Sequence, residues 1–583
     1  MRLTFARLLL LAGVLAQGAT AVRAQQSIEV QPHSNTDNAT ATGTEAVADG
    51  SALIDQSTLP SAIELKGSRP RVDPSVIEPA ATNLAEPFSS LASPSSLALP
   101  NTTSEVKIRE LRPLTLAEAE QIAEVNSPVL KQAKSAAEQA KSNLLAAHAL
   151  WYPTISIGSE LKYNDVNTNI YNTNNDDSIR YNRSYELTQR WITSFTASAE
   201  WKVISPSRVP QIAKARDTYE MARNTYLIGL RKLRLDTAKA YFTLQRQDAG
   251  VNIGQSAVRA SLVSLRDAKA RFTAGVATKL EVLEAETQLS RDQTQLTEYL
   301  GKQSIARRNL ANLLDLPQDI TPTAADPTLV AGLWQPSLEE SIVAAYAFRE
   351  ELDKLILKIS TNNSDANISL ARVQPVFTLF NDFSSTRTEG GNANPEKGNR
   401  SVEVNWGDYT WNAGNTVGLK FSWSVFDGGI AMARYRQNKQ KAQQSEFEFA
   451  AERDKIRVTV EESFYNLKTA NRTLKTSGMA VLTARESLRL SRLRFQAGVT
   501  TQREVVDNQR DLNTSLQTYA NSMLTYNTSL FQLRRRTGLD HIEACNSPDL
   551  PAQKSTALYE SIDVPIKPIP LKPACNSSIS QAD

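Results

Sequence analysis

The side chains able to do chemistry are few in this sequence and stand far apart. Histidine occurs only at His33, His148 and His541. A metal centre or a nucleophile–base arrangement needs several such groups brought together, and these three fall in unrelated segments. The sequence also contains no Gly-x-x-x-x-Gly-Lys phosphate loop. It therefore predicts a protein that is not an enzyme and that holds no metal or cofactor.

Two cysteines, Cys545 and Cys575, lie near the C-terminus. In an exported chain an intrachain disulfide is the simple expectation, and two free thiols are the alternative. The formal net charge is only +3 and no basic block is present, so nucleic acid is not an expected partner.

A pair of carboxylates offers a third kind of chemistry, the attraction of cations. Glu504 and Asp507 stand three residues apart, so they share one face if their segment is helical. Taken alone, such a pair is usually a solvated charge pair on a helix surface. Its meaning depends on the elements that position it.

The chain begins with the pattern of a secretory signal. Arg2 and Arg7 precede an apolar run at residues 8–14, and Val22-Arg23-Ala24 offers a cleavage site, which gives a signal peptide of residues 1–24. The alternative, a membrane anchor, needs about 20 successive apolar residues. No later stretch is that long, so any membrane crossing must be made by strands.

Two flanks are expected to lack regular structure. Residues 25–108 are rich in Ser, Thr, Ala, Asn and Pro without periodicity, which predicts a disordered or loose linker. The tail of residues 542–583 contains four closely spaced prolines that exclude a helix.

Between these flanks an internal duplication divides the chain into residues 109–330 and 331–541. One motif occurs twice, first at residue 271 and again at residue 494. Its copies are Arg271-Phe272-Thr273-Ala274-Gly275-Val276 and Arg494-Phe495-Gln496-Ala497-Gly498-Val499. Pro153 and Pro375, Trp201 and Trp423, and Thr115 and Ser337 repeat with spacings that agree within one residue. Such agreement predicts two copies of one structural unit.

Each copy is expected to contain the same elements. The first starts with a helix from Thr115 to Leu150. Alternating strands follow near residues 154–163 and 196–203, and their counterparts lie near 376–383 and 419–425, with polar loops at 164–189 and 384–414. A half-buried sheet in a soluble sandwich shows the same alternation. Four strands cannot close a barrel alone, however, so strands from several chains must be pooled.

Long helices with apolar residues at steps of seven follow each strand pair. From Pro206 the pattern runs through Leu244, Val251, Val258, Leu265 and Phe272, which predicts a supercoiled helix about 100 Å long. Gly275 and Gly498 are expected to turn the chain into an antiparallel return helix.

These features resemble the TolC-like outer membrane efflux proteins of Gram-negative bacteria, the outer membrane factors. The resemblance covers about residues 114–540, and its most specific elements are the two Arg-Phe-x-Ala-Gly-Val turns and the string from Phe421 to Gly429 that ends in Phe-Asp-Gly-Gly. It implies a mixed α and β membrane protein. Three chains would give four strands each to a twelve-stranded outer-membrane β-barrel, continued by a coiled-coil tunnel through the periplasm.

The resemblance also implies roles for particular residues and partners. The tunnel would give passive exit to substrates delivered by an inner-membrane pump or ABC transporter, in a tripartite efflux or type I secretion system. A periplasmic adaptor would contact the hairpin tips, and outer-membrane lipid would surround the barrel. Trp201 and Trp423 are candidates for an interfacial girdle, or else pack in an ordinary core. The adaptor-contact residues would be Arg271, Phe272, Gly275, Val276, Arg494, Phe495, Gly498 and Val499, although any such turn favours its glycines.

Glu504 and Asp507 match the pore constriction of the family. The sequence departs from the family where Thr500 replaces an arginine that ties the entrance shut, although the acidic counterpart Glu281 is present; Arg503 is a candidate substitute. The first copy also has Ile204-Ser205-Pro206-Ser207 in place of Phe-Asp-Gly-Gly.

A periplasmic coiled-coil scaffold or adaptor without a pore is the competing interpretation. It explains the long helices. It does not explain two copies of paired amphipathic strands flanking polar loops, or the tryptophans at equivalent strand positions.

Overall fold

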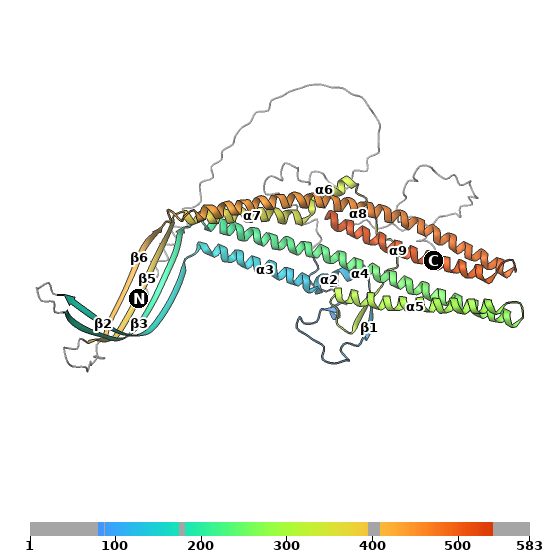
Figure 1. Ribbon diagram of the computed structural model, residues 1–583, viewed down its shortest axis with the longest axis horizontal. Helices are drawn as coiled ribbons and strands as arrows, with labels where there is room; N and C mark the ends of the chain where they lie inside the picture. The colour runs from blue at the N-terminus through green and yellow to red at the C-terminus, as the bar shows by residue number, and fades with distance from the viewer. Residues whose placement is uncertain (1–79, 85, 87, 174–180, 394–408, 540–583) are drawn as a thin grey trace, which may run out of the picture. The chain divides into compact units, whose positions relative to one another are not determined.

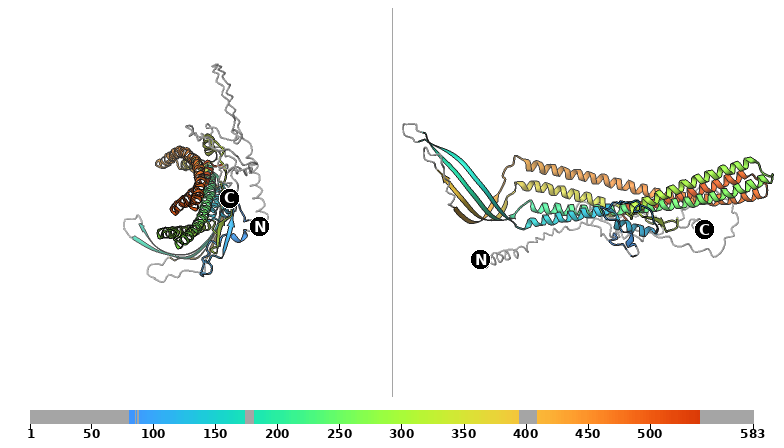
Figure 2. Two further views of the ribbon diagram at one scale, coloured as in Figure 1. Left: turned by 90° about the vertical axis from the view of Figure 1, so that its right-hand side faces the viewer. Right: turned by 90° about the horizontal axis from the view of Figure 1, so that it is seen from below.

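The computed structural model describes residues 80–84, 86, 88–173, 181–393 and 409–539. Its main sheet has four antiparallel strands in the order β2-β3-β5-β6. The sheet is curved and open, with β2 and β6 at its edges (Figure 2). The strands are β2 (Thr154–Thr173), β3 (Tyr181–Ile204), β5 (Val376–Ala393) and β6 (Tyr409–Ser422).

These strands are longer than the sequence predicted. The segments 164–189 and 384–414, expected as polar loops, belong largely to the strands, which leaves only 174–180 and 394–408 outside the described residues. Polar and aromatic residues can continue a ladder because the backbone bonds do not depend on side-chain polarity. Composition alone therefore gave the wrong strand ends.

The helices extend from one end of the sheet, and their order repeats in the second copy (Figure 1). Helix α3 and strand β2 begin at residues 128 and 154, while helix α7 and strand β5 begin at 350 and 376. The spacing of 222 residues matches that between the sequence motifs. The helical elements are α2 (Leu116–Asn126), α3 (Pro128–His148), α4 (Arg208–Thr273), α5 (Lys279–Leu313), α6 (Leu338–Phe348), α7 (Glu350–Leu370), α8 (Ile430–Gln496) and α9 (Gln502–Thr537), with short 3-10 turns η4 (Ser89–Leu91), η5 (Ala149–Trp151) and η6 (Ala371–Val373).

The helix predicted from Thr115 to Leu150 is broken at Ser127. The Ser127 side chain accepts a hydrogen bond from the Leu130 amide, and Pro128 occupies the first turn of α3. Proline is favoured there because its missing N–H would have no helical partner. The second copy is broken at the equivalent place, Arg349. The chain therefore bends between the short helices and the strand-proximal ones.

The predicted stripe of large apolar residues is buried only in part of α4. Leu244 and Val251 are buried, whereas Phe272 is 47% exposed. Nearer the turn the buried seam consists of small residues, among them Gly254. A Cβ atom at Gly254 would lie 3.3 Å from the Leu296 Cα atom of α5, so small residues allow the two helices of this hairpin to approach closely. The seam comprises Gly250, Gly254, Ala257, Ser261 and Ala268.

Part of the expected loose linker is packed against the helices. Asn126, only 1% exposed, donates to the carbonyl of Leu91 at 2.7 Å and to that of Leu314 at 3.1 Å. Leu91 itself is buried in a core with residues of α2, α4 and α5. A small parallel sheet of β1 (Glu110–Leu114) and β4 (Ile320–Ala324) adjoins it. A few large apolar residues are enough to pack this segment against the helices. The overall composition of the segment, which is polar, does not reveal them.

Buried ion pairs join α4 and α9 to the two helix breaks, which lie between α2 and α3 and between α6 and α7. Arg231 of α4 contacts Glu350 of α7 at 2.9 Å, and Arg234 contacts Glu124 of α2 at 2.6 Å. Glu351 contacts both Arg349 at 3.1 Å and Arg535 at 2.6 Å. These pairs connect α4 and α9 with the breaks between the shorter helices.

The Glu351 cluster predicts an acid-sensitive contribution to stability. Burial alone would raise the pKa of Glu351, but Arg535 and Arg349 outweigh it and lower that pKa to about 2. The stabilisation is therefore present above the ordinary value of 4.5 and is lost as the pH falls toward 2, amounting to at most about 3 kcal/mol. Denaturation followed by circular dichroism should show Glu351→Gln less stable than the natural chain at pH 6. The gap should shrink steadily between pH 4.5 and 2; a constant gap would contradict the assignment.

None of the helices in the described part of the chain is both long enough and apolar enough to span a membrane.

Candidate functional site

The register of the four strands separates an apolar face from a polar one. Ile155 lies opposite Ala199, which lies opposite Asn381, which lies opposite Val417. Directly opposed residues share a face, and many of the large apolar side chains of this face are exposed, with Val417 and Leu419 both at 64%. The other face carries mainly Thr, Ser and charged side chains.

Aromatic residues stand at both ends of the apolar face. Near the helices, the indole N–H of Trp201 donates to the carbonyl of Trp151 at 3.0 Å, and that of Trp423 donates to Val373 at 3.0 Å, so the duplicated tryptophans make duplicated bonds. Trp201 is partly buried and Trp423 is 51% exposed. At the far end lies a group that the sequence analysis missed, formed by Tyr163, Trp191, Tyr409 and Trp411.

The two hairpin turns have the same geometry. Gly275 has φ 74° and Gly498 has φ 75°, values that favour glycine. The Val276 amide donates to the Arg271 carbonyl at 2.9 Å, and the Val499 amide donates to the Arg494 carbonyl at 2.9 Å. These bonds close the ends of α4 and α8 as the repeated motif predicted. Phe272, Val276 and Val499 remain exposed at the tips.

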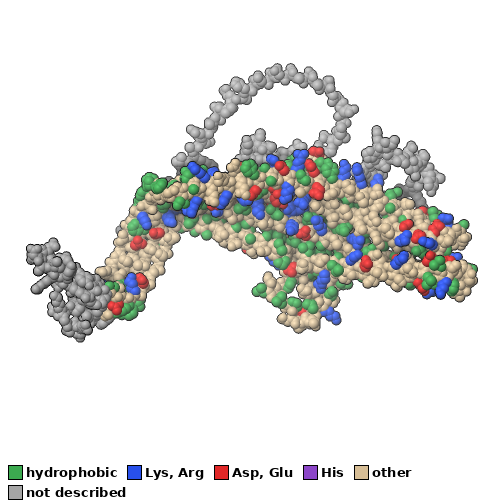
Figure 3. Space-filling view, viewed as in Figure 1, with side chains coloured by type: hydrophobic (Ala, Val, Ile, Leu, Met, Phe, Trp, Pro, Cys, Tyr) green, Lys and Arg blue, Asp and Glu red, His purple; other side chains and the backbone are tan. Residues whose placement is uncertain are grey.

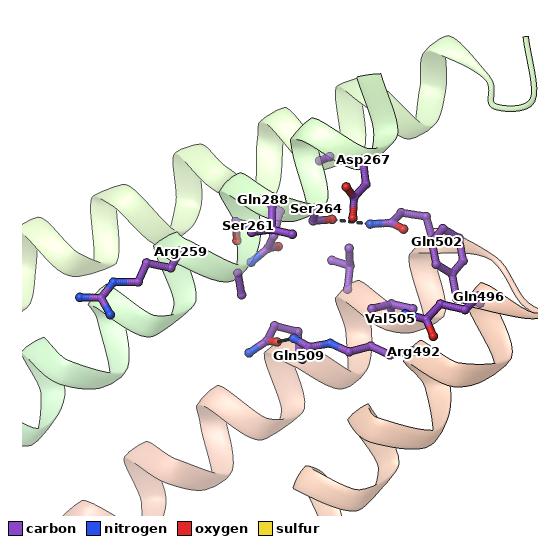
Figure 4. Close-up of a pocket in the computed structure, with 15 residues that line it drawn as sticks. Arg259, Ser261, Ser264, Asp267, Gln288, Arg492, Gln496, Gln502, Val505 and Gln509 are labelled. Atoms are coloured by element: carbon purple, nitrogen blue, oxygen red, sulfur yellow. Dashed lines mark hydrogen bonds between the residues drawn. The ribbon is translucent and has the colours of Figure 1, made fainter. Parts of the chain in front are cut away.

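The hairpins α4–α5 and α8–α9 line a partly open pocket of about 530 Å³ near these turns (Figure 4). Gln502 of α9 donates a hydrogen bond to the Ser264 hydroxyl of α4 across it. The Arg271 guanidinium lies 4.4 Å from the centre of the Phe495 ring, which adds a second link between the hairpins. Sequence analysis included Arg271 and Phe495 but missed Gln502 and Ser264, because single polar residues carry no motif.

The acidic residues near the second turn have local partners within the chain. Glu504 accepts a hydrogen bond from Arg494 at 3.0 Å and another from the Thr500 hydroxyl. Asp507 lies 3.4 Å from Arg510. Arg503 is exposed and forms no ion pair with the described residues. Thr500 therefore holds Glu504 directly, while the geometry provides no support for Arg503 as a substitute latch.

Glu281 occupies the position in the first copy that Glu504 occupies in the second. Its carboxylate accepts from the Thr278 amide at 3.4 Å, and the Thr278 side chain accepts from the Glu281 amide at 3.3 Å. This reciprocal pair caps the start of α5. Cys545 and Cys575, the expected disulfide, lie outside the described residues.

A sheet with one exposed apolar face, joined to long helical hairpins, defines a class of protein that crosses a membrane with strands and extends away from it with helices. The model of the family described as outer membrane efflux protein matches residues 120–315 and 342–539. Outer membrane protein TolC of Escherichia coli (strain K12) is 22% identical over 459 residues, which cover 77% of this chain and 85% of TolC.

Solved structures of outer-membrane proteins have the same fold. CusC superposes with a TM-score of 0.56 at 15% identity, covering 79% of this chain and 99% of CusC. VceC from Vibrio cholerae gives 0.56 at 14% identity, covering 73% and 96%. The chain belongs to the outer membrane efflux protein family. It is an outer-membrane channel component of an efflux system, with its helical part in the periplasm.

Proposed function

We propose that three copies of this chain close one twelve-stranded barrel in the outer membrane and one helical tunnel beneath it. The single observation that carries this proposal is the strand register, which places an exposed apolar face on one side and a polar face on the other. An open sheet leaves its edge strands β2 and β6 without partners on one side. Pooling strands satisfies these edges, and lipid covers the apolar face.

The height of the apolar face supports the barrel. Trp201 and Trp191 stand on the same face of β3, ten residues apart in the sequence. At about 3.3 Å per residue and a tilt of about 40°, this separation spans about 25 Å, the height of the lipid-facing band in such barrels. Trp201 and Trp423 would then belong to the periplasmic girdle, and Tyr163, Trp191, Tyr409 and Trp411 to the outer one.

The hairpin tips would be the contact with a periplasmic adaptor, which in turn would connect the tunnel to an inner-membrane pump or ABC transporter. The exposed Phe272, Val276 and Val499 support this role, since exposed apolar groups at an otherwise charged end favour a protein partner. Passage through the tunnel would be passive. The links between Arg271 and Phe495 and between Gln502 and Ser264 would hold the hairpins together until the partners separate them.

The test of this function is the conductance of the detergent-purified mature chain in a planar lipid bilayer, with its mass measured in the same detergent. Discrete channels from a species of three chains are the expected result. Folded helical protein that leaves with the soluble periplasmic fraction and forms no channels would favour the scaffold instead.

Glu504 and Asp507 are proposed to form the selective constriction, together with Thr500 and Glu281. Three copies would bring six carboxylates from α9 around one axis, which would attract cations. The double variant Glu504→Gln/Asp507→Asn should therefore lower the potassium-to-chloride permeability ratio, by about threefold or more.

Reversal potentials measured in a salt gradient would check this expectation. Glu298→Gln, on α5 beyond the turn, is the matched control because it removes an exposed carboxylate paired with Lys302 far from the proposed constriction. An unchanged ratio in the double variant would show that these residues are only a solvated helix-surface pair.

A further inference from the structure

A row of lysines crosses the polar face of the sheet at its helix-proximal end. Lys202 lies opposite Thr378, and Thr378 lies opposite Lys420. The two lysines therefore share the polar face, with their Cα atoms about 10 Å apart across two strand spacings. Both side chains are exposed, and neither forms an ion pair with the described residues. The row is thus a concentration of positive charge with no ion-pair partner among the described residues.

The other charges of the polar face lie farther from the helices. Glu200 stands one row above the lysines and Asp382 two rows above, with rows about 6.6 Å apart. Higher still, Lys162 forms an ion pair with Glu160 at 3.5 Å. A solute that enters the sheet region from the helices therefore meets the lysine row first.

A third cation lies at the same junction. Arg208, at the start of α4, is only 3% exposed, and its guanidinium stacks 4.3 Å from the centre of the Trp151 ring. It donates to the main-chain carbonyls of Lys202 and Val203. Among the described residues its Nε atom has no hydrogen-bond partner and no carboxylate pairs with it. A guanidinium stays protonated at neutral pH, so Arg208 adds a positive charge beside the lysine row.

The first turns of α8 extend the positive region into the helices. Between residues 430 and 445 this helix carries Arg434, Arg436, Lys439 and Lys441 and no Asp or Glu. Figure 3 shows Lys and Arg side chains along the strand-proximal part of the α7–α8 layer. The charge at this end is thus opposite in sign to the acidic pair beside the second hairpin turn.

We propose that Lys202, Lys420 and Arg208 form a cationic collar where the barrel joins the tunnel, and that the collar favours cargo bearing carboxylate, phosphate or sulfate groups. The proposal rests on the trimeric barrel proposed above, in which the polar face lines the lumen. Six lysines would then surround the path at one level. Water-filled passages with low-dielectric walls concentrate the field of such a ring, so the collar sets a preference for anions at the outer-membrane end.

The experiment compares the double variant Lys202→Gln/Lys420→Gln with Lys162→Gln, both in the full mature chain. Reversal potentials are measured in planar bilayers under a potassium chloride gradient at low salt, where screening is weak. The double variant should raise the potassium-to-chloride permeability ratio about twofold or more. Lys162→Gln, which also leaves Glu160 without its partner, should raise the ratio by clearly less, because it removes one positive charge per chain instead of two and lies outside the lysine row. Millimolar citrate, added as a trivalent anion probe, should reduce the conductance of the natural channel and lose that effect in the double variant.

The outcomes separate this inference from the proposed function. Failure of the natural chain to form channels would overturn the trimeric barrel and the collar with it. Channels whose permeability ratio is the same in the natural chain and the double variant would overturn the collar alone. An equal rise in Lys162→Gln would also overturn it, because total lumen charge rather than this row would then set the preference. A matching denaturation midpoint for all three proteins ensures that folded channels are compared.

Discussion

Replacing Glu350 with alanine should lower the free energy of unfolding by about 3–5 kcal/mol, because it strips a buried arginine of its carboxylate. The side chains of Arg231 and Glu350 are 2% and 6% exposed, and their Nε and Oε1 atoms lie 2.9 Å apart. Burial raises the pKa of Glu350 while Arg231 opposes that rise, so the carboxylate depends on its partner to stay ionised. Arg231 also donates to the Gly538 carbonyl at the end of α9. The loss should therefore loosen α4, α7 and α9 together.

Chemical denaturation of the detergent-solubilised chain, followed at the helical circular dichroism band, would measure this effect. Glu298→Ala provides the control, since its partner Lys302 is half exposed and surface pairs contribute little. The double variant Arg231→Met/Glu350→Leu should recover much of the lost stability, because apolar groups of similar size can replace a buried pair. If Glu350→Ala matched the surface control, the pair would not be structurally important.

Changing Phe383 to arginine should block assembly of the barrel in lipid. Phe383 stands midway along the apolar face, opposite Ala197, and packs edge-on against Phe195 at 6.4 Å between ring centres. Each arginine at mid-depth on a lipid-facing barrel surface costs about 2–4 kcal/mol, and a trimer would contain three. The refolded yield in phospholipid vesicles, measured by resistance to added protease, should therefore fall steeply.

Ser384→Arg is the matched control because Ser384 is the next residue of the same strand and lies opposite Thr196 on the polar face. It should assemble nearly as well as the natural chain, since its charge would point into water. Equal loss in both variants would indicate a general defect of β5. A greater loss in Ser384→Arg would mean that the polar face, rather than the apolar one, meets lipid.

The two ends of this conduit differ in electrostatic character if both proposals hold. The constriction near the hairpin turns would carry Glu504 and Asp507, and the collar would carry Lys202, Lys420 and Arg208. Cargo with an anionic group would then be opposed at the entrance and favoured at the exit. Separation of the hairpins by the partners would reduce the repulsion at the entrance and leave the attraction at the exit. The remaining attraction would favour outward passage.

The order and type of the long helices and of the four strands of the main sheet were determined by the sequence itself. The repeated Arg-Phe-x-Ala-Gly-Val motif predicted both hairpin turns, because a helix that must reverse favours glycine in the left-handed region. The common spacing of the repeats predicted that each strand of the main sheet and each long helix has a counterpart. Alternation of apolar and polar residues predicted strands with two unlike faces. These are local properties, which depend on residues near one another in the chain.

Only the tertiary structure decided which residues from different elements meet. The strands extend through segments whose polar composition suggested loops, since cross-strand pairing stabilises a ladder whatever its polarity. Residues near Leu91 are packed against the helices, where Asn126 donates a hydrogen bond to the Leu91 carbonyl. The Gln502–Ser264 hydrogen bond joins residues more than two hundred positions apart. Lys202 and Lys420 likewise form one row only through the register of three strands. A shift of one residue would place either lysine on the opposite face, and no local pattern fixes that register.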